Sequence, residues 1–242
     1  MKDIQNQLDH RRINIKKVGV KTISYPVTVL DKAKKRQNTI ASVNMYVNLP
    51  HRFKGTHMSR FVEILNQFHG EIDLKSFQKI LVRMKERLEA EASHLEMSFL
   101  YFLSKEKMSE SLKVCHYRCS FIGSLEDEQD LQLKVEIPVI LPLIQTEFKG
   151  LPRSRGHWGK AEVLLRLKSF VWIEDLILLI EGAIETEQSS LATTGHDALS
   201  VESLTRGIAE SLARLAGVNW FSLRVENLGN EYSTFATLEC SV

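Results

Sequence analysis

The stretch Lys54-Gly55-Thr56-His57-Met58-Ser59-Arg60-Phe61 marks a junction between a strand and a helix. An alternating apolar run precedes it, apolar residues recur at helical spacing after it, and Gly70 stands where a helix would end. The first turn of this helix therefore carries an imidazole, a hydroxyl and a guanidinium beside backbone N–H groups that favour anions. These side chains belong to His57, Ser59 and Arg60. In the alternative interpretation, Thr56 or Ser59 only caps the helix and Arg60 is a solvated charge.

The composition indicates a globular chain with a sizeable core. Of its 242 residues 43% are apolar, and 32 basic residues balance 30 acidic ones, so nothing general attracts it to nucleic acid or membrane. The longest apolar run, residues 173–184, contains three acidic residues, and the N-terminus lacks the apolar core of a signal peptide. Cys115, Cys119 and Cys240 fit neither a disulfide framework nor a zinc pattern. We therefore expect a cytoplasmic protein with free thiols.

Periodicity predicts the same order of elements twice. The first half reads as strands 15–30 and 39–49, helices 59–70 and 73–88, and strands 94–104 and 111–122. The second half reads as strands 131–141 and 160–171, helices 172–185 and 200–216, and strands 220–226 and 232–240. We expect Pro26 to bend the first strand, Asp73 and Ser200 to cap their helices, and Gly217 to end the last one.

A duplicated ββααββ unit predicts an α+β protein. Each half, residues 1–125 and 126–242, should form an antiparallel four-stranded sheet with two helices layered on one face. Because such sheets have open edges, edge pairing between units and between subunits is expected.

Several segments resemble the type IB GTP cyclohydrolases over nearly the whole chain. They are KGTHMSRF at 54–61, YVNLP at 46–50, Asp9 and Arg12 with VGV at 18–20, WIEDLI at 172–177, Val201-Glu202 with Arg206, and Glu226-Asn227 with Ala236. The resemblance implies the tunnelling fold, or T-fold, and a homo-oligomer, usually a tetramer, with active sites where subunits meet. It also implies hydrolysis of the imidazole ring of GTP to formate and 7,8-dihydroneopterin triphosphate, with water activated by a divalent metal such as Zn or Mn.

The chain departs from this family at the expected metal ligands. A Leu-Cys-Pro-Cys-Ser-Lys stretch and a Gly-Ala-His-Asn-Gln-Arg stretch are typical of the family, and their first cysteine and histidine bind metal. Here His157 is retained, Gln145 replaces the cysteine, Lys149 falls on the motif lysine and Lys160 stands for the arginine. A neutral amide is a poor substitute for a thiolate ligand.

Two further family segments are changed. The Leu-Lys-Arg-Pro-Asp-Glu stretch, which supplies a carboxylate ligand, is missing between Glu181 and Ser200, and residues 229–234 replace a Glu-Ser-Ile-His-x-His stretch. His157 alone cannot hold a metal. An altered site would need other donors, from a neighbouring subunit or from Glu187 and His196, although a His196-Asp197 pair is more often part of an exposed loop.

Features suited to ligand binding are retained. Glu202 matches the carboxylate with which tunnelling-fold proteins accept two N–H bonds from the edge of a purine or pterin. In the alternative interpretation, Glu202 is only a glutamate on the first turn of a helix, where the helix dipole favours a negative charge. The basic residues between positions 149 and 160 suggest an anion site or, equally, a solvated loop. These are Lys149, Arg153, Arg155, His157 and Lys160.

Two hypotheses follow from the sequence. The first is a GTP cyclohydrolase with an altered metal arrangement, in which His157 is catalytic and His57, Ser59, Arg60, Lys149, Lys160 and Glu202 bind substrate. The second is a metal-free purine- or pterin-binding or regulatory relative without a cofactor. The ligand losses favour the second, and the extent of the resemblance favours the first.

Overall fold

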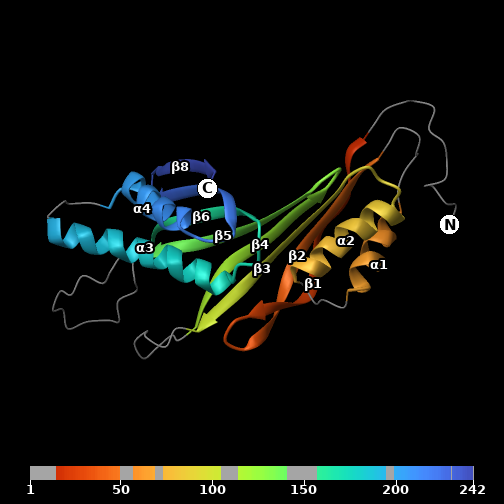
Figure 1. The fold of residues 1–242 in the computed structure, drawn as a ribbon, viewed down its shortest axis with the longest axis horizontal. Coiled ribbons are helices and arrows are strands. Elements are labelled where there is room, and N and C mark those ends of the chain that lie inside the picture. The colour runs from red at the N-terminus through yellow and green to blue at the C-terminus, as the bar shows by residue number, and fades with distance from the viewer. Residues whose placement is uncertain are drawn as a thin grey trace. The chain divides into compact units, whose positions relative to one another are not determined.

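The computed structural model describes residues 15–49, 57–68, 73–104, 114–140, 157–194, 199–229 and 231–241. Within these ranges the elements follow the order ββααββ twice, as predicted (Figure 1). The first set comprises β1 (Ile15–Asp31), β2 (Lys35–Leu49), α1 (Met58–Asn66), α2 (Leu74–Arg87), β3 (Ser93–Ser104) and β4 (Val114–Leu125). The second set comprises β5 (Gln129–Ile140), β6 (His157–Leu167), α3 (Ile173–Thr194), α4 (Val201–Ala213), β7 (Val218–Leu228) and β8 (Ser233–Ser241).

The chain forms two compact units, residues 1–133 and 134–242, whose boundary falls inside β5. In each unit the strands lie in chain order, and the registered neighbours are antiparallel. The predicted α+β class is therefore confirmed. The predicted division into residues 1–125 and 126–242 stays a prediction.

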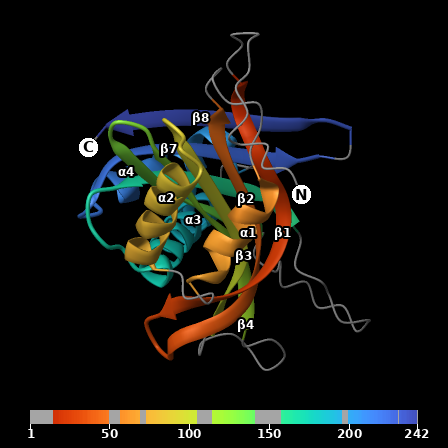
Figure 2. The same cartoon turned by 90° about the vertical axis from the view of Figure 1, so that its right-hand side faces the viewer.

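Unit 1 is built on the alternation of β2. Ala41, Val43, Met45 and Val47 are fully buried, and α1 and α2 lie side by side over the face they share (Figures 1 and 2). Phe77 of α2 packs against Gly123 of β4, where any Cβ would lie 2.4 Å from the Phe77 ring. The opposite face of the sheet, called the open face below, carries polar side chains together with exposed apolar ones such as Ile40, Leu100 and Phe102.

Unit 2 repeats this arrangement with different residues. Ala161, Val163 and Leu165 of β6 are fully buried together with Leu223 and Val225 of β7. The two helices α3 and α4 pack against each other, and α4 lies against β7 and β8. Unit 2 thus also has one apolar face under helices and an open face that carries charged side chains and the exposed Phe235.

The helix ends correct several predictions. The N-cap of α1 is His57, without a side-chain cap bond, so Ser59 lies inside the helix, and α1 ends at Asn66. Thr56 and Gly70 lie outside the described residues. Asp73 and Ser200 cap α2 and α4 as predicted. However, α4 ends at Ala213, well before Gly217.

The largest difference is in α3, which continues past the predicted end at residue 185 to Thr194. The added turns contain hydroxyl side chains that bond back to the helix: Thr186 Oγ1 donates to the carbonyl of Gly182, and Ser189 Oγ to that of Glu185, each at 2.8 Å. Because these polar groups are satisfied within the helix, the loss of apolar periodicity does not end it.

The three cysteines form no disulfide, but of the thiols expected to be buried Cys119 is buried and Cys115 and Cys240 are half-buried. Cys115 and Cys119 share one face of β4 with buried Tyr117. None of the helices in the described ranges combines the length and apolar character needed to cross a bilayer.

Candidate functional site

Two β-bulges shape the end of β1 in unit 1. The register against β2 slips once between Ile15 and Val18 and again between Val20 and Ile23, whereas Pro26 pairs regularly with Ile40. The register irregularities of β1 therefore lie away from Pro26, and a bend at Pro26 stays a prediction. The extra residues let Val18, Val20 and Ile23 all oppose helix-facing residues of β2, and they leave Lys17 and Lys21 on the open face.

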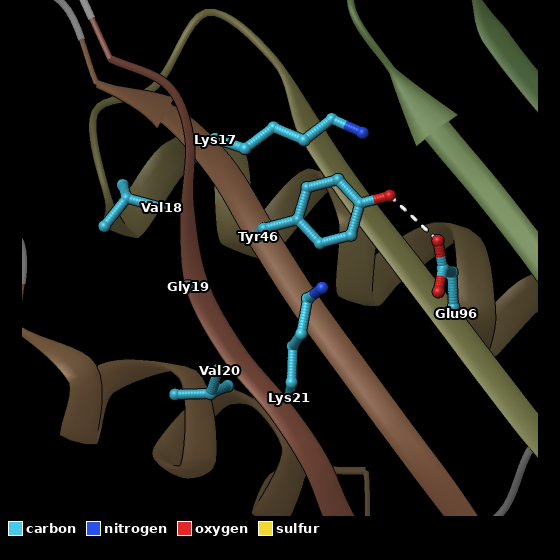
Figure 3. A pocket seen from close by; sticks show the side chains of 7 residues that line it. All are labelled: Lys17, Val18, Gly19, Val20, Lys21, Tyr46 and Glu96. Carbon is cyan, nitrogen blue, oxygen red and sulfur yellow. Dashed lines mark hydrogen bonds between the residues drawn. The ribbon is translucent and has the colours of Figure 1, made fainter.

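The bulged segment borders a hollow with a volume of about 420 Å³, which we call the β1 hollow (Figure 3). Its lining consists of Lys17, Val18, Gly19, Val20, Lys21, Tyr46 and Glu96. Gly19 is required because an added Cβ would lie 1.9 Å from the carbonyl oxygen of Met45. The hollow thus combines two ammonium groups with a phenol and a carboxylate.

A chain of hydrogen bonds fixes the polar side of the hollow. Tyr46 Oη donates to Glu96 Oε1, Asn44 Nδ2 donates to Glu96 Oε2, and the Thr22 backbone N–H donates to Asn44 Oδ1, each at 2.9 Å. Thr22 lies in the second bulge with a φ of 56°, in the left-handed region. The side-chain network therefore ties the irregular backbone of β1 to β2 and β3.

The Tyr46 ring has two close neighbours. The His94 ring stacks on it with centroids 4.9 Å apart and an interplanar angle of 18°, and Lys17 Nζ lies 4.5 Å from its centroid. Burial, together with the hydrogen bond to Glu96 and its charge, raises the pKa of Tyr46 to about 12. Burial and then the Lys17 charge lower the pKa of His94. At neutral pH Tyr46 is therefore a hydrogen-bond donor and His94 is uncharged.

The open face of unit 2 carries charges that pair with one another. Lys134 Nζ lies 2.9 Å from Glu162 Oε1. Lys160 Nζ lies 3.7 Å from Glu226 Oε2, and Arg224 Nη2 lies 3.8 Å from Glu226 Oε1. Lys160 stands on β6 and not in the predicted basic loop. Its ammonium is therefore already engaged in this unit.

The residues predicted from the strand-to-helix junction lie at the start of α1. His57 is half-buried, Ser59 is exposed, and Arg60 Nη1 donates to the Arg87 carbonyl at 3.4 Å. Their placement on one helical turn is confirmed, and their role in substrate binding stays a prediction.

The remaining predicted residues belong to unit 2. Glu202 lies exposed on the first turn of α4, and His157 begins β6. Glu187 of α3 is half-buried, with its carboxylate against Gly207 of α4. Gln145, Lys149, Arg153, Arg155 and His196 lie outside the described residues.

Lys17, Lys21, His94 and Glu96 were not among the site residues predicted from the sequence. Gly19 and Tyr46 do stand in segments that carry the family resemblance, and this was the available signal. The bulges could not be inferred from alternation, because Val18, Val20 and Ile23 do not keep one period across the second bulge.

The donors present do not fit the metal set that the resemblance implies. Among the described residues, no three His, Cys, Asp or Glu side chains gather closely enough to hold a metal ion. Where the family has two histidines, Tyr232, Ser233 and Thr234 stand exposed between β7 and the start of β8. With Gln145 in place of the cysteine, His157 is the single retained donor of the motif pair.

The duplicated ββααββ arrangement has the architecture of T-fold proteins. The structure is similar to uricase from Arthrobacter globiformis, with a TM-score of 0.55, 9% identity and coverage of 94% of this chain and 93% of that one. It is also similar to a hyperthermostable mutant of Bacillus sp. TB-90 urate oxidase, with a TM-score of 0.60, 10% identity and coverage of 94% and 100%. At these identities the similarity shows the fold alone.

Sequence similarity defines the family of this chain more specifically than the fold does. Residues 1–230 match the family model described as Type I GTP cyclohydrolase folE2. The chain is 42% identical over 242 residues to GTP cyclohydrolase FolE2 of Syntrophus aciditrophicus, covering 94% of each chain, and 40% identical over 256 residues to that of Syntrophobacter fumaroxidans, covering 100% of each. The chain belongs to the GTP cyclohydrolase FolE2 family.

Proposed function

We propose that this protein acts on GTP as a cyclohydrolase, opening the imidazole ring to release formate and form 7,8-dihydroneopterin triphosphate. The observation that carries the proposal is the full-length similarity to relatives named GTP cyclohydrolase FolE2 at about 40% identity. The T-fold architecture is consistent with it, although a fold by itself does not determine a reaction.

Glu202 is the proposed contact for the guanine base. It is exposed on the first turn of α4, so both carboxylate oxygens are accessible to accept bonds from the guanine N1–H and amino groups. The basic and hydroxyl groups of His57, Ser59, Arg60, Lys149 and Lys160 would contact the triphosphate. To contact the triphosphate, Lys160 would have to give up its ion pair with Glu226.

A cytoplasmic homotetramer is proposed as the working state. The outer edges of β1 and β8 have no neighbouring strand within the described chain, which suits pairing with further subunits. Light scattering of the purified protein should then give about four times the mass of one subunit.

A second candidate function is binding of a purine or pterin without ring opening. The observation that favours it is the misfit of the metal donors, with Gln145 at the cysteine position and Tyr232 to Thr234 where histidines are expected. A divalent metal, Zn or Mn, belongs to the first candidate function and is not required by the second.

One assay separates the two candidates. The purified protein is incubated with GTP, without metal and with Mn or Zn, while formate and neopterin fluorescence are measured. The first candidate predicts both products from the wild type and their loss in His157→Ala. The second predicts GTP or dihydropterin binding by calorimetry, weakened in Glu202→Gln, with no formate under any condition.

A further inference from the structure

The β1 hollow has an excess of positive charge. Lys17 and Lys21 both line it, and within the described part of the chain no carboxylate forms an ion pair with either ammonium. Glu96, the one acidic residue in the lining, already accepts bonds from Tyr46 and Asn44. His94, whose pKa is lowered, adds no charge at neutral pH. The local balance of two cations and one engaged anion favours an anionic ligand.

The geometry also restricts the size and type of this ligand. The Tyr46 ring already contacts the stacked His94 ring and the Lys17 ammonium, so a flat heterocycle would have to compete with these two partners in order to stack on it. An ammonium carries three donors, and contact with a ring leaves the others available. In Figure 3 the Lys17 side chain runs above the Tyr46 side chain and the Lys21 side chain lies below it. A compact oxyanion suits two such donors better than a base does.

Lys17, Gly19 and Lys21 alternate with Val18 and Val20, so both lysines lie on the open face, and one bulge flanks the segment at each end. Each bulge adds one residue to the open face, and the second bulge is held by the Thr22 to Asn44 to Glu96 bonds. Bulges of this kind are common beside binding sites because they redirect side chains. Gly19, between the two lysines, leaves no side chain over the strand at this point.

We propose that the β1 hollow binds a phosphate or phosphoryl oxyanion through Lys17 and Lys21. The site lies on the open face of unit 1 and shares no residue with the proposed GTP contacts. The same chemistry could be supplied by free phosphate or by the phosphates of a nucleotide, and the test distinguishes these sources.

The test measures binding by calorimetry at low ionic strength, with orthophosphate, tripolyphosphate, GTP and guanosine as separate ligands. The double variant Lys17→Ala/Lys21→Ala is compared with Lys34→Ala/Lys79→Ala, which removes equal charge from exposed lysines elsewhere in unit 1. We expect saturable binding of orthophosphate or tripolyphosphate that weakens at least about tenfold in the first variant and stays within about twofold in the second.

Lysine footprinting on the wild type locates the site directly. Phosphate should protect Lys17 and Lys21 from reductive methylation while Lys34 and Lys79 react as before. Stronger protection by tripolyphosphate or GTP than by orthophosphate assigns the source to a phosphate chain. Absence of saturable binding, equal loss in both double variants, or lysine-dependent binding of guanosine would overturn the proposal. None of these results depends on cyclohydrolase turnover.

Discussion

The open faces of the two units differ in how their charged side chains are paired. In unit 2 three cations and three carboxylates on β5, β6 and β7 pair with one another, so these six charges balance. In unit 1 a carboxylate is bonded to the neutral Tyr46 and Asn44, and the bulged β1 presents two lysines that no ion pair neutralises among the described residues. Balanced charges suit a structural surface, whereas unbalanced charges beside a hollow suit ligand binding.

The largest expected effect concerns the glycines that bring the strands together in each unit. In Gly19→Ala and Gly159→Ala the new Cβ would lie 1.9 Å from a carbonyl oxygen, of Met45 or Glu226 respectively. Each substitution should lower the free energy of unfolding by about 3 kcal/mol, because the backbone has to move. Urea unfolding measures this. Gly182→Ala, with open space around the Cβ, should instead stabilise α3 by about 0.5–1 kcal/mol.

Removing one carboxylate from each open face should show their difference. Glu96→Ala leaves Tyr46 Oη and the Asn44 amide without their acceptor, and should destabilise by about 2 kcal/mol. Glu162→Ala breaks a partly exposed ion pair with Lys134 and should destabilise by about 0.5 kcal/mol, an effect that shrinks in high salt. Similar losses from the two variants in urea unfolding would contradict the distinction between the two faces.

The helix caps provide a smaller contrast. Asp73 accepts from the Ser76 N–H at 2.6 Å and forms a reciprocal capping box, whereas Ser200 accepts from Ser203 at 3.1 Å. Both alanine variants should destabilise by about 1 kcal/mol in thermal or urea unfolding, with Asp73→Ala the larger. A larger loss from Ser200→Ala would show that the reciprocal bond adds nothing.

Only the Asp73 effect should depend on pH. Burial alone would raise its pKa, but the hydrogen bonds from Ser76, together with the backbone N–H and the charge of Lys75, outweigh burial and hold the pKa below 3.8. The ionised form is thus favoured in the fold. This stabilisation is complete above the unfolded pKa and is lost as pH falls through the folded pKa. The difference between wild type and Asp73→Ala should therefore shrink in acid.

The smallest expected effect is a shift in the pKa of His94. Burial and the Lys17 charge hold the pKa of His94 below 6.5, so its NMR midpoint should be lower than that of an exposed histidine. Because the folded pKa is depressed, this stability is present above pH 6.5 and is lost as pH falls toward the folded value. Lys17→Ala should move the midpoint upward without restoring it fully, since burial remains. An unchanged midpoint in that variant would place Lys17 away from His94.

The sequence predicted the repeated order of elements because alternation and capping act over a few residues. Val43, Met45 and Val47 share one buried face, and Asp73 and Ser200 cap their helices, as expected. The end of α3 was missed because Thr186 and Ser189 satisfy their hydroxyls inside the helix. The β1 hollow was missed because its bulges depend on pairing with β2, and its key residues are drawn from separate strands.

The central claim is that GTP is the substrate of this chain. It is tested most directly by the amount of formate released from GTP by the purified protein in the presence of Mn or Zn. The account predicts formate and a fluorescent neopterin product from wild type, both lost in His157→Ala. Bound GTP with no formate, under conditions where a curated relative turns over, would contradict it.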